Sequence, residues 1–559
     1  MKTYRIFVYL IIAFTVMTAC TNSTKRMEEE AGVFLRSLEN EIIPVYIEWN
    51  KASFQASISG KDEDYRKRSE YELMYSRILA DKDKFSSVSA FRKNPAIKDS
   101  LIKRALDIMY NTMIRYQIDS VRMKALITAQ EDVEKKFSTF RAEFDGKSLS
   151  DNEIDSILLN SRKTAELEKA WKASKVVGNL VAEDIRNLVK LRNEIAVDLG
   201  YGNYHEMSLR ISDQDPAEVS QLFDELDSLT RGEFAVLKDE IDSILAGQLK
   251  ISREKLMPWH YQNRFFQEAP KIYESDLDKY YSGKDILQVV KNYYEGIGLQ
   301  VQDIIERSDL YEKPGKYQHA YCTSIDRAGD VRVVANIRNN QYWTNTMLHE
   351  LGHAVYDKYI DSSLMFTLRE PAHTFTTEAI ANFFGNMASN PKWMQRNLGL
   401  TPEEGGKIAG DARLYARLEK LVFSRWCQVM FRFEKSMYEN PGQDLNKLWW
   451  DMAERYQLLK RPEGWNNPDW ASKIHIASYP CYYHNYMLGD LLAAQLNAYL
   501  EENILGEKEP SFTGRPELGE YLMEKVFKPG SRYYWNEMIG RATGEKLTAR
   551  HYAEQYVEK

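Results

Sequence analysis

Four long segments in the first 200 residues have the periodicity of α-helices and contain few prolines. They are charged, their apolar residues recur at the spacing of one helix face, and they cover residues 27–56, 62–82, 98–145 and 150–200. No internal repeat and no Gly/Ser-rich linker divides the chain after them. The pattern predicts a mainly α fold in which residues 31–559 form one large helical domain.

The composition is that of a soluble globular protein. The chain has 559 residues, of which 43% are hydrophobic and 28% charged, so a sizeable core is available. The net charge is −7 and no basic stripe is present, so we expect no nucleic-acid partner. Apart from Cys20, the three cysteines are widely spaced, which permits at most one disulfide and no zinc ribbon.

The N-terminus has the pattern of an export signal. A short basic region precedes an apolar run over residues 6–17, which is too short to span a membrane but suits a signal peptide. Residues 17–20 resemble a bacterial lipoprotein processing site, at which Cys20 becomes the lipidated first residue. We therefore expect a signal peptide over 1–20, a polar tether over 21–30, and an exported bacterial lipoprotein. Its lipid would be the one membrane anchor, with the domain facing the periplasm or displayed at the cell surface. The alternative is simple secretion with an unmodified cysteine.

One region breaks the helical pattern. Residues 317–325 and 331–337 are rich in β-forming side chains, and the short loop between them contains Gly329. This arrangement predicts an antiparallel hairpin. Because a free strand edge can hold an extended peptide by main-chain hydrogen bonds, the hairpin is a candidate peptide-binding element.

A metal-binding motif follows the predicted hairpin. Residues 343–360 have the apolar spacing of a buried helix, on which His349 and His353 project from one face. Two neutral imidazoles at this spacing can share Zn²⁺ and leave room for a third ligand and water. Glu350 is placed to act as a general base on that water. The alternative, two surface histidines on an amphipathic helix, agrees poorly with so apolar a segment.

The third zinc ligand is not identified by the motif itself. The downstream candidates are Glu370, His373 and Glu378. Glu378 lies in a predicted helix over 377–388, which threonines can cap, and its carboxylate would complete a His₂Glu site. Glu370 could do the same, and the residues alone leave this choice open.

The motif together with Glu378-Ala-Ile380 resembles the angiotensin-converting-enzyme family of peptidyl-dipeptidases, in a bacterial version. The resemblance runs from about residue 270 to the C-terminus, and the earlier helical half carries no motif that supports it. It implies a helical gluzincin peptidase with a small antiparallel sheet beside the metal helix and a deep cleft between two helical halves. It also implies that Glu378 is the third ligand.

The same resemblance assigns residues that hold the substrate. His319 precedes His349 by thirty residues, and with the backbone of Ala320 it would bind the substrate main chain. Lys473 would bind the terminal carboxylate of the peptide, and His475 would stabilise the transition state. Both roles are chemically sensible, because ammonium pairs with carboxylate and a donor near zinc stabilises a developing oxyanion.

A tyrosine pair follows these residues. Tyr483 and Tyr486 reproduce the Y-x-x-Y spacing of the family, which makes Tyr486 the oxyanion donor and Tyr483 a contact of the substrate carboxylate. The match requires one extra residue after His475, so Tyr482 remains an alternative donor.

The chain departs from the family at several positions. Arginines that bind chloride in the animal enzymes correspond to Ala453 and Asn485, so we do not expect chloride activation. An aspartate that supports the metal helix corresponds to Asn382, and support of the ligands should differ there. A glutamine that helps bind the substrate carboxylate has no counterpart near residues 278–279. The closing segment, 527–545, also resembles thimet-oligopeptidase-like enzymes and zinc carboxypeptidases.

These features predict a zinc metallopeptidase that releases C-terminal dipeptides from oligopeptides. The alternatives on the same scaffold are an oligoendopeptidase and a single-residue carboxypeptidase. A different alternative is a lipoprotein that binds peptides without cleaving them. The presence of Glu350 argues against it, because that glutamate would then have no structural role.

Overall fold

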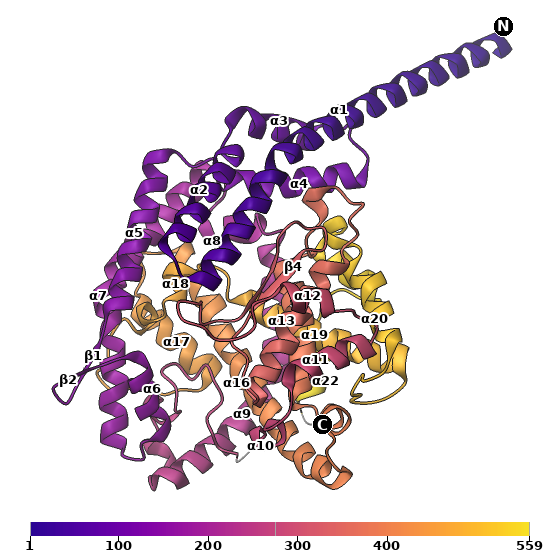
Figure 1. Ribbon diagram of the computed structural model, residues 1–559. Coiled ribbons are helices and arrows are strands. Elements are labelled where there is room, and N and C mark those ends of the chain that lie inside the picture. Colours follow the sequence, from indigo (N-terminus) through magenta and orange to yellow (C-terminus); the bar gives the residue numbers. More distant parts are fainter. Residues whose placement is uncertain (1, 274–275, 558–559) are drawn as a thin grey trace.

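The computed structural model describes residues 2–273 and 276–557, with side chains from residue 24 onward. It is 70% helical, and the described residues contain two small antiparallel sheets of two strands each (Figure 1). The predicted mainly α fold is therefore confirmed. Among the described residues, no helix is both long and apolar enough to cross a membrane. The side chain of Cys20 lies outside the described residues, and its lipidation stays a prediction.

The N-terminal helices agree with the predicted segments but are divided more finely. They are α1 (Lys2–Ser59), α2 (Asp62–Leu79), α3 (Lys82–Lys93), α4 (Ser100–Ile114), α5 (Ser120–Thr139), α6 (Asp151–Asn160), α7 (Thr164–Asp198), α8 (Tyr204–Arg210) and α9 (Pro216–Leu249). The predicted helix over 98–145 is two helices, because Asp119 caps α5 by accepting hydrogen bonds from two backbone N–H groups of its first turn. In Figure 1 the start of α1 projects beyond the body of the molecule.

A hairpin that the sequence analysis did not predict follows α5. Strands β1 (Ala142–Phe144) and β2 (Lys147–Leu149) are joined by Asp145 and Gly146, which have φ angles of 51° and 75°. Positive φ at both positions is typical of the tight turn that Asp-Gly favours. The Asp-Gly pair was the signal that could have identified this hairpin.

The predicted hairpin before the metal motif is present and shorter than expected. Strands β3 (Tyr321–Ser324) and β4 (Val331–Val334) pair antiparallel, with Tyr321 opposite Val334 and Ser324 opposite Val331. Asp309 forms a bridge with β4, whereas β3 has no second strand partner among the described residues. One edge of β3 is therefore free of strand pairing.

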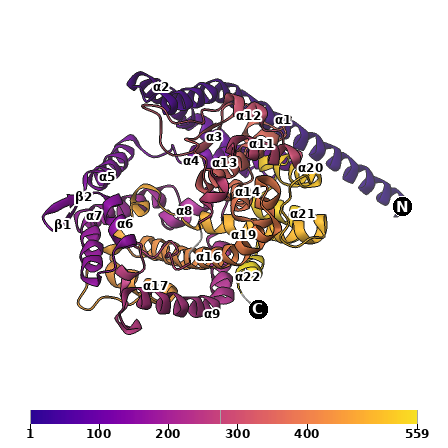
Figure 2. The same cartoon turned by 60° about the horizontal axis from the view of Figure 1, so that its bottom comes forward.

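The C-terminal half carries the helices of the candidate site. They are α10 (Asp278–Tyr281), α11 (Ile286–Gly296), α12 (Gln302–Arg307), α13 (Gln341–Tyr359), α14 (Thr374–Gly385), α15 (Pro391–Leu398), α16 (Pro402–Glu439), α17 (Leu445–Gln457), α18 (His475–Ser478), α19 (His484–Tyr499), α20 (Pro516–Leu522), α21 (Trp535–Thr543) and α22 (Arg550–Tyr556). Figure 2 shows α16 between α9 and α17 on one side and α14 and α19 on the other.

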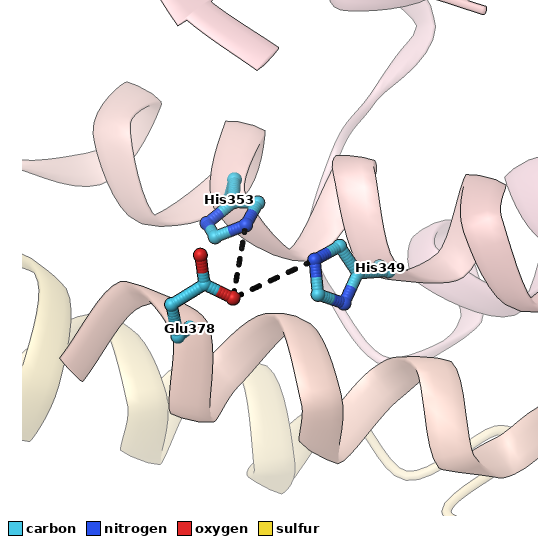
Figure 3. Close-up of side chains that lie close together, drawn as sticks. All are labelled: His349, His353 and Glu378. Carbon is cyan, nitrogen blue, oxygen red and sulfur yellow. Dashed lines mark ion pairs between the residues drawn. The ribbon is translucent and has the colours of Figure 1, made fainter. Parts of the chain in front are cut away.

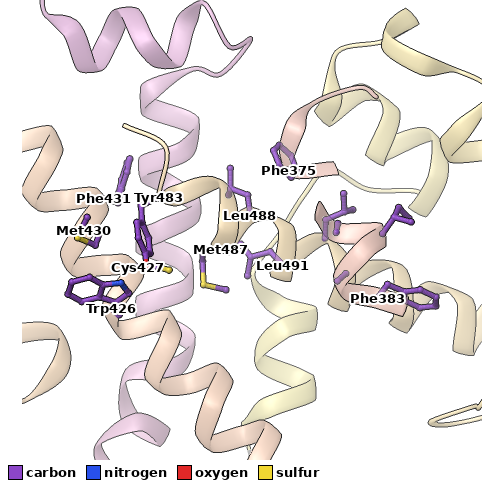
Figure 4. Packing of buried hydrophobic residues seen from close by; sticks show 14 of the residues in the cluster. Phe375, Phe383, Trp426, Cys427, Met430, Phe431, Tyr483, Met487, Leu488 and Leu491 are labelled. Atoms are coloured by element: carbon purple, nitrogen blue, oxygen red, sulfur yellow. The ribbon is translucent and has the colours of Figure 1, made fainter. Parts of the chain in front are cut away.

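The core beside the site is built by side chains of α14, α16 and α19 (Figure 4). Trp426, Met430, Met487 and Leu491 in this cluster are fully buried. Because each such side chain contributes about 1.5–3 kcal/mol on burial, the cluster holds α19 firmly against α14 and α16.

Two glycines let α14 approach its neighbours closely. A Cβ atom on Gly352 of α13 would lie 2.8 Å from the Cα atom of Ala381, and a Cβ atom on Gly489 of α19 would lie 3.3 Å from the Cβ atom of Glu378. The added Cβ at Gly352 would meet the backbone of Ala381, which cannot move aside as a flexible side chain could. The helix that carries Glu378 therefore fits between α13 and α19 because both neighbours lack a side chain there.

We expect Gly352→Ala to destabilise the protein by about 1–3 kcal/mol, because the added methyl group overpacks the contact between α13 and α14. Reversible urea unfolding measures this change. Gly406→Ala is the matched control: it also lies in a helix, nothing approaches its Cβ position within 4 Å, and it should stabilise by about 0.5–1 kcal/mol. Equal stability of the two variants would contradict the packing argument.

Candidate functional site

Three candidate metal ligands meet where α13 packs on α14 (Figure 3). The Nε2 atoms of His349 and His353 lie 3.8 Å and 3.9 Å from Oε2 of Glu378. One ligand atom of each residue lies within 4.8 Å of the others. Neighbouring ligands of a tetrahedral zinc ion are about 3.4 Å apart when each bond is about 2.1 Å, so only a small contraction would be needed.

Both histidines are held in the form that binds a metal. Burial lowers the pKa of His349 to about 4 and that of His353 to about 3, so both imidazoles are neutral at physiological pH. Nδ1 of His353 lies 2.7 Å from the hydroxyl of Thr377, and the side chain of Asn382 forms a hydrogen bond with His349. Such partners orient the rings and leave the Nε2 lone pairs for a cation.

A buried charge pair lies behind Asn382. The Nδ2 group of Asn382 donates to Oδ1 of Asp490 at 3.2 Å, and Nζ of Lys420 donates to the same oxygen at 2.9 Å. Asp490 is 6% exposed and also raises the pKa of Glu378. We expected the residue that supports the metal ligands to differ from the family at Asn382. In the structure, the amide of Asn382 links His349 to the carboxylate of Asp490 on α19.

Glu350 lies beside the metal triad and the free edge of β3. Burial, together with the nearby carboxylate of Glu378, raises the pKa of Glu350 to about 8, and the backbone N–H of Cys322 donates a hydrogen bond to it. Burial likewise raises the pKa of Glu378 to about 7. A divalent cation would relieve the repulsion between these carboxylates, so the donor set fits Zn²⁺ in charge as well as in chemistry.

The other downstream candidates for the third ligand have different roles. Glu370 forms an ion pair with Arg327 and is not part of the cluster. His373 caps α14: its Nδ1 atom accepts the backbone N–H of Phe375 at 3.1 Å, and its Nε2 atom contacts the carbonyl oxygen of Ser212 at 2.8 Å.

Lys473 occupies a buried cationic site lined by aromatic rings. Its Nζ atom donates to Oε1 of Gln267 at 2.6 Å and lies 5.4–5.6 Å from the ring centres of Phe265, Trp426 and Tyr483. No carboxylate pairs with Lys473 among the described residues. Burial and the charge of Arg264 lower its pKa to about 8, so it is largely charged at pH 7.

Gln267 was missed by the sequence analysis, which looked for such a glutamine near residues 278–279. It lies 206 positions before Lys473 and meets it through the tertiary structure alone. No local pattern around residue 267 could have identified the contact.

The three candidate tyrosines separate into two environments. Tyr483 packs against Lys473 and lies 5.3 Å from the ring of His475. Burial and the charge of Glu378 raise the pKa of both Tyr482 and Tyr486, so these two phenols lie on the metal side. The structure therefore leaves both as possible oxyanion donors. His475 is neutral, because burial lowers its pKa to about 4, and its buried Nδ1 atom has no hydrogen-bond partner among the described residues.

The remaining predicted residues are not part of the metal cluster. His319 is exposed, and its ring lies 5.4 Å from that of Tyr317; no contact with the metal triad is found among the described residues. Ala320 is half-buried and directly precedes β3. At the positions matched to chloride-binding arginines, Ala453 is buried and Asn485 accepts a hydrogen bond from Gln214 at 2.8 Å.

Comparison with known families supports a peptidase. The model of "Peptidase family M3" matches residues 160–558, and the model of "Angiotensin-converting enzyme" matches residues 25–262. The resemblance to the angiotensin-converting-enzyme family is confirmed. The part of the chain that matches differs from the expectation. That family's model matches the N-terminal part, in which we identified no motif.

Individual relatives are distant. Carboxypeptidase 1 of Bacillus subtilis is 25% identical over 269 residues, which are 42% of this chain and 50% of the relative. Thermostable carboxypeptidase 1 of Pyrococcus furiosus is 26% identical over 257 residues, 41% of this chain and 50% of the relative. The Inactive angiotensin-converting enzyme-related protein of Caenorhabditis elegans is 29% identical over 136 residues, 23% of this chain and 15% of the relative.

The chain thus spans about half the length of the curated carboxypeptidases it matches. The family assignment rests on the family models instead, since one of them covers well over half of the chain. The helical fold and the paired histidines with a carboxylate agree with that assignment. The chain belongs to peptidase family M3 and is related to angiotensin-converting enzyme, both of them families of zinc-dependent metallopeptidases.

Proposed function

We propose that this chain is a zinc-dependent exopeptidase that releases dipeptides from the C-terminus of oligopeptides. The observation that carries the proposal is Lys473, a buried ammonium group with no carboxylate partner among the described residues. A buried cation without a counter-ion is costly, and the α-carboxylate of a peptide would satisfy it. Endopeptidases need no such group.

His349, His353 and Glu378 are the proposed zinc ligands. A zinc ion bound there would supply Lewis-acid polarisation of the scissile carbonyl and a water molecule of lowered pKa. The Glu350 carboxylate is placed to take a proton from the attacking water and to deliver it to the amide nitrogen of the leaving group. Its buried position beside Cys322 keeps bulk water away from this transfer.

His475 and Tyr486 are the proposed donors to the carbonyl oxygen as it becomes negative. Both lie in the segment between Lys473 and the body of α19, and a neutral imidazole can donate through one ring nitrogen. Tyr482 shares the electrostatic influence of Glu378 and is the alternative donor.

The free edge of β3 is the proposed site for the substrate main chain. The backbone N–H of Cys322 donates to Glu350, so this edge borders the catalytic carboxylate. Backbone groups two residues apart in an extended strand point to the same side, which places those of Ala320 on the same edge. A peptide added there would pass the metal site, with His319 beside it.

A single-residue carboxypeptidase is the second candidate. It is favoured by the names of two relatives, which are called carboxypeptidases. Both activities require the Lys473 anchor, and they differ in the number of residues that fit between the anchor and the metal. Oligoendopeptidase activity and binding without cleavage remain the alternatives that the experiment below separates.

For the cellular location, we propose export with a lipid at Cys20 as the one attachment to the membrane. The proposal rests on the N-terminal pattern of a basic region, a short apolar run and a small-residue processing site.

The proposed function predicts cleavage of oligopeptides with a free C-terminus and at least about tenfold slower cleavage of the amidated forms, since the amide lacks the charge that Lys473 binds. Mass spectrometry identifies the products. A chelator and Glu350→Gln should each abolish cleavage, the latter because the base is lost. Dipeptide products support the proposal, single residues favour the carboxypeptidase, and internal cleavage indifferent to amidation contradicts both.

Gln267→Glu tests the carboxylate anchor with minimal change of shape. The new carboxylate would pair with Lys473 and repel the peptide terminus, so kcat/KM for free C-termini should fall about 10- to 100-fold. Amidated peptides should be affected far less, and their rates serve as the internal control. A uniform fall for both peptide types would show that the residue acts through the fold and not through the anchor.

Asp490→Asn tests the support of the proposed metal site. We expect zinc affinity to fall about tenfold, because the partner that orients Asn382 and through it His349 is weakened. Competition with a chromophoric chelator measures affinity without reference to activity. Glu403→Gln, a change at a carboxylate that is 79% exposed and pairs with Lys407, is the control. Unchanged zinc affinity in a folded Asp490→Asn variant would remove the proposed role of this residue.

A further inference from the structure

A cavity of about 410 Å³ lies between the N-terminal helices and the segment that precedes α19. Its walls come from α4, α5, α7 and α8, from the start of α14, and from residues 480–485. About half of the lining residues are Ile, Leu, Met or Pro and the others are polar, and the volume falls in the range of about 300–1,000 Å³ that is usual for ligand sites.

The wall of this cavity carries a positive charge and no negative charge. Among the residues that line it, Arg115 is the one cation and no carboxylate is present. Nη2 of Arg115 is held by the carbonyl oxygen of Ile211 at 3.3 Å and by the hydroxyl of Ser212 at 3.2 Å. No ion pair of Arg115 is found among the described residues. Its charge is thus available to a ligand.

His373, the other wall residue that could carry a positive charge, is neutral. Burial lowers the pKa of His373 to about 4, and both of its ring nitrogens are used. Nδ1 accepts from the backbone, so Nε2 carries the proton that is donated to Ser212. Asn485 adds a neutral donor: its Oδ1 atom is occupied by Gln214, while its amide nitrogen has no acceptor among the described residues.

The cavity is related to the metal site through one of its wall residues. Tyr482 lines the cavity and is influenced by the charge of Glu378. The next residue, Tyr483, contacts Lys473. None of the residues around Lys473 lines the cavity. The segment that carries these tyrosines therefore separates two binding regions, with the metal triad beside it.

We propose that this cavity binds the part of the peptide that precedes the scissile bond, and that Arg115 selects an acidic side chain there. The inference rests on the proposed peptidase function. If the C-terminal end of a substrate is held at Lys473, the residues before the cleaved bond must continue past the metal triad toward Tyr482 and the cavity. A pocket lined by apolar and neutral polar residues, with one available guanidinium and no carboxylate, favours a side chain that combines methylene groups with a carboxylate, as glutamate does.

The test compares hexapeptides that share their last two residues and carry either Glu or Gln at one of the first four positions. In the native protein, kcat/KM should be about tenfold higher for the Glu peptide at one of these positions, because a charge-assisted hydrogen bond replaces a neutral one. The preference should weaken as ionic strength rises. Arg115→Gln should remove this preference by lowering kcat/KM for the Glu peptide.

Arg122→Gln is the matched control. It also removes one positive charge, but Arg122 lies on α5, pairs with Asp198 and does not line the cavity. It should retain the preference. Calorimetric binding of the same peptides to the Glu350→Gln protein gives a readout that does not need catalysis. Equal affinities for Glu and Gln peptides at all four positions, or a preference that survives Arg115→Gln, would overturn the inference. Failure of every peptide to be cleaved, with the binding preference intact, would count against the proposed activity alone.

Discussion

The close contact between α13 and α14 is the constraint on which the site depends. Two histidines on α13 can share a cation only if a carboxylate from another helix reaches them, and Glu378 does so because Gly352 lets the two backbones approach. The helix α19 completes the arrangement, since it packs against α14 at Gly489 and carries Asp490 behind the ligands. Packing of small residues thus produces a group of donors with the charge and spacing that zinc requires.

Burial determines the protonation of the titratable residues around this group. The same low-dielectric surroundings keep the histidines neutral, raise the pKa of Glu350 and lower the pKa of Lys473. These effects have one physical origin, but they act on groups with different proposed roles as ligand, base and anchor. In the segment between Lys473 and α19, the neighbouring residues Tyr482 and Tyr483 face different parts of the site.

Much of the fold was predictable because it depends on local periodicity. The long helices, the β3–β4 hairpin and the metal helix follow from spacings within a few residues. The missed hairpin at Asp145 and Gly146 also had a local signal, although it lay where one segment predicted as helical ended, at residue 145, shortly before the next began at residue 150. In contrast, the match to angiotensin-converting enzyme, residues 25–262, lies outside the motifs that resembled that family, whereas the match to peptidase family M3, residues 160–558, includes them.

The sequence by itself determined the pair of histidines on one helix face and the adjacent base, because four residues make about one helical turn. It left open the choice between Glu370 and Glu378, which the structure separates by placing Glu370 against Arg327. The tertiary structure alone brought Gln267 to Lys473 and enclosed the cavity beside Arg115. Contacts between residues hundreds of positions apart depend on how whole helices pack, and no local pattern encodes that geometry.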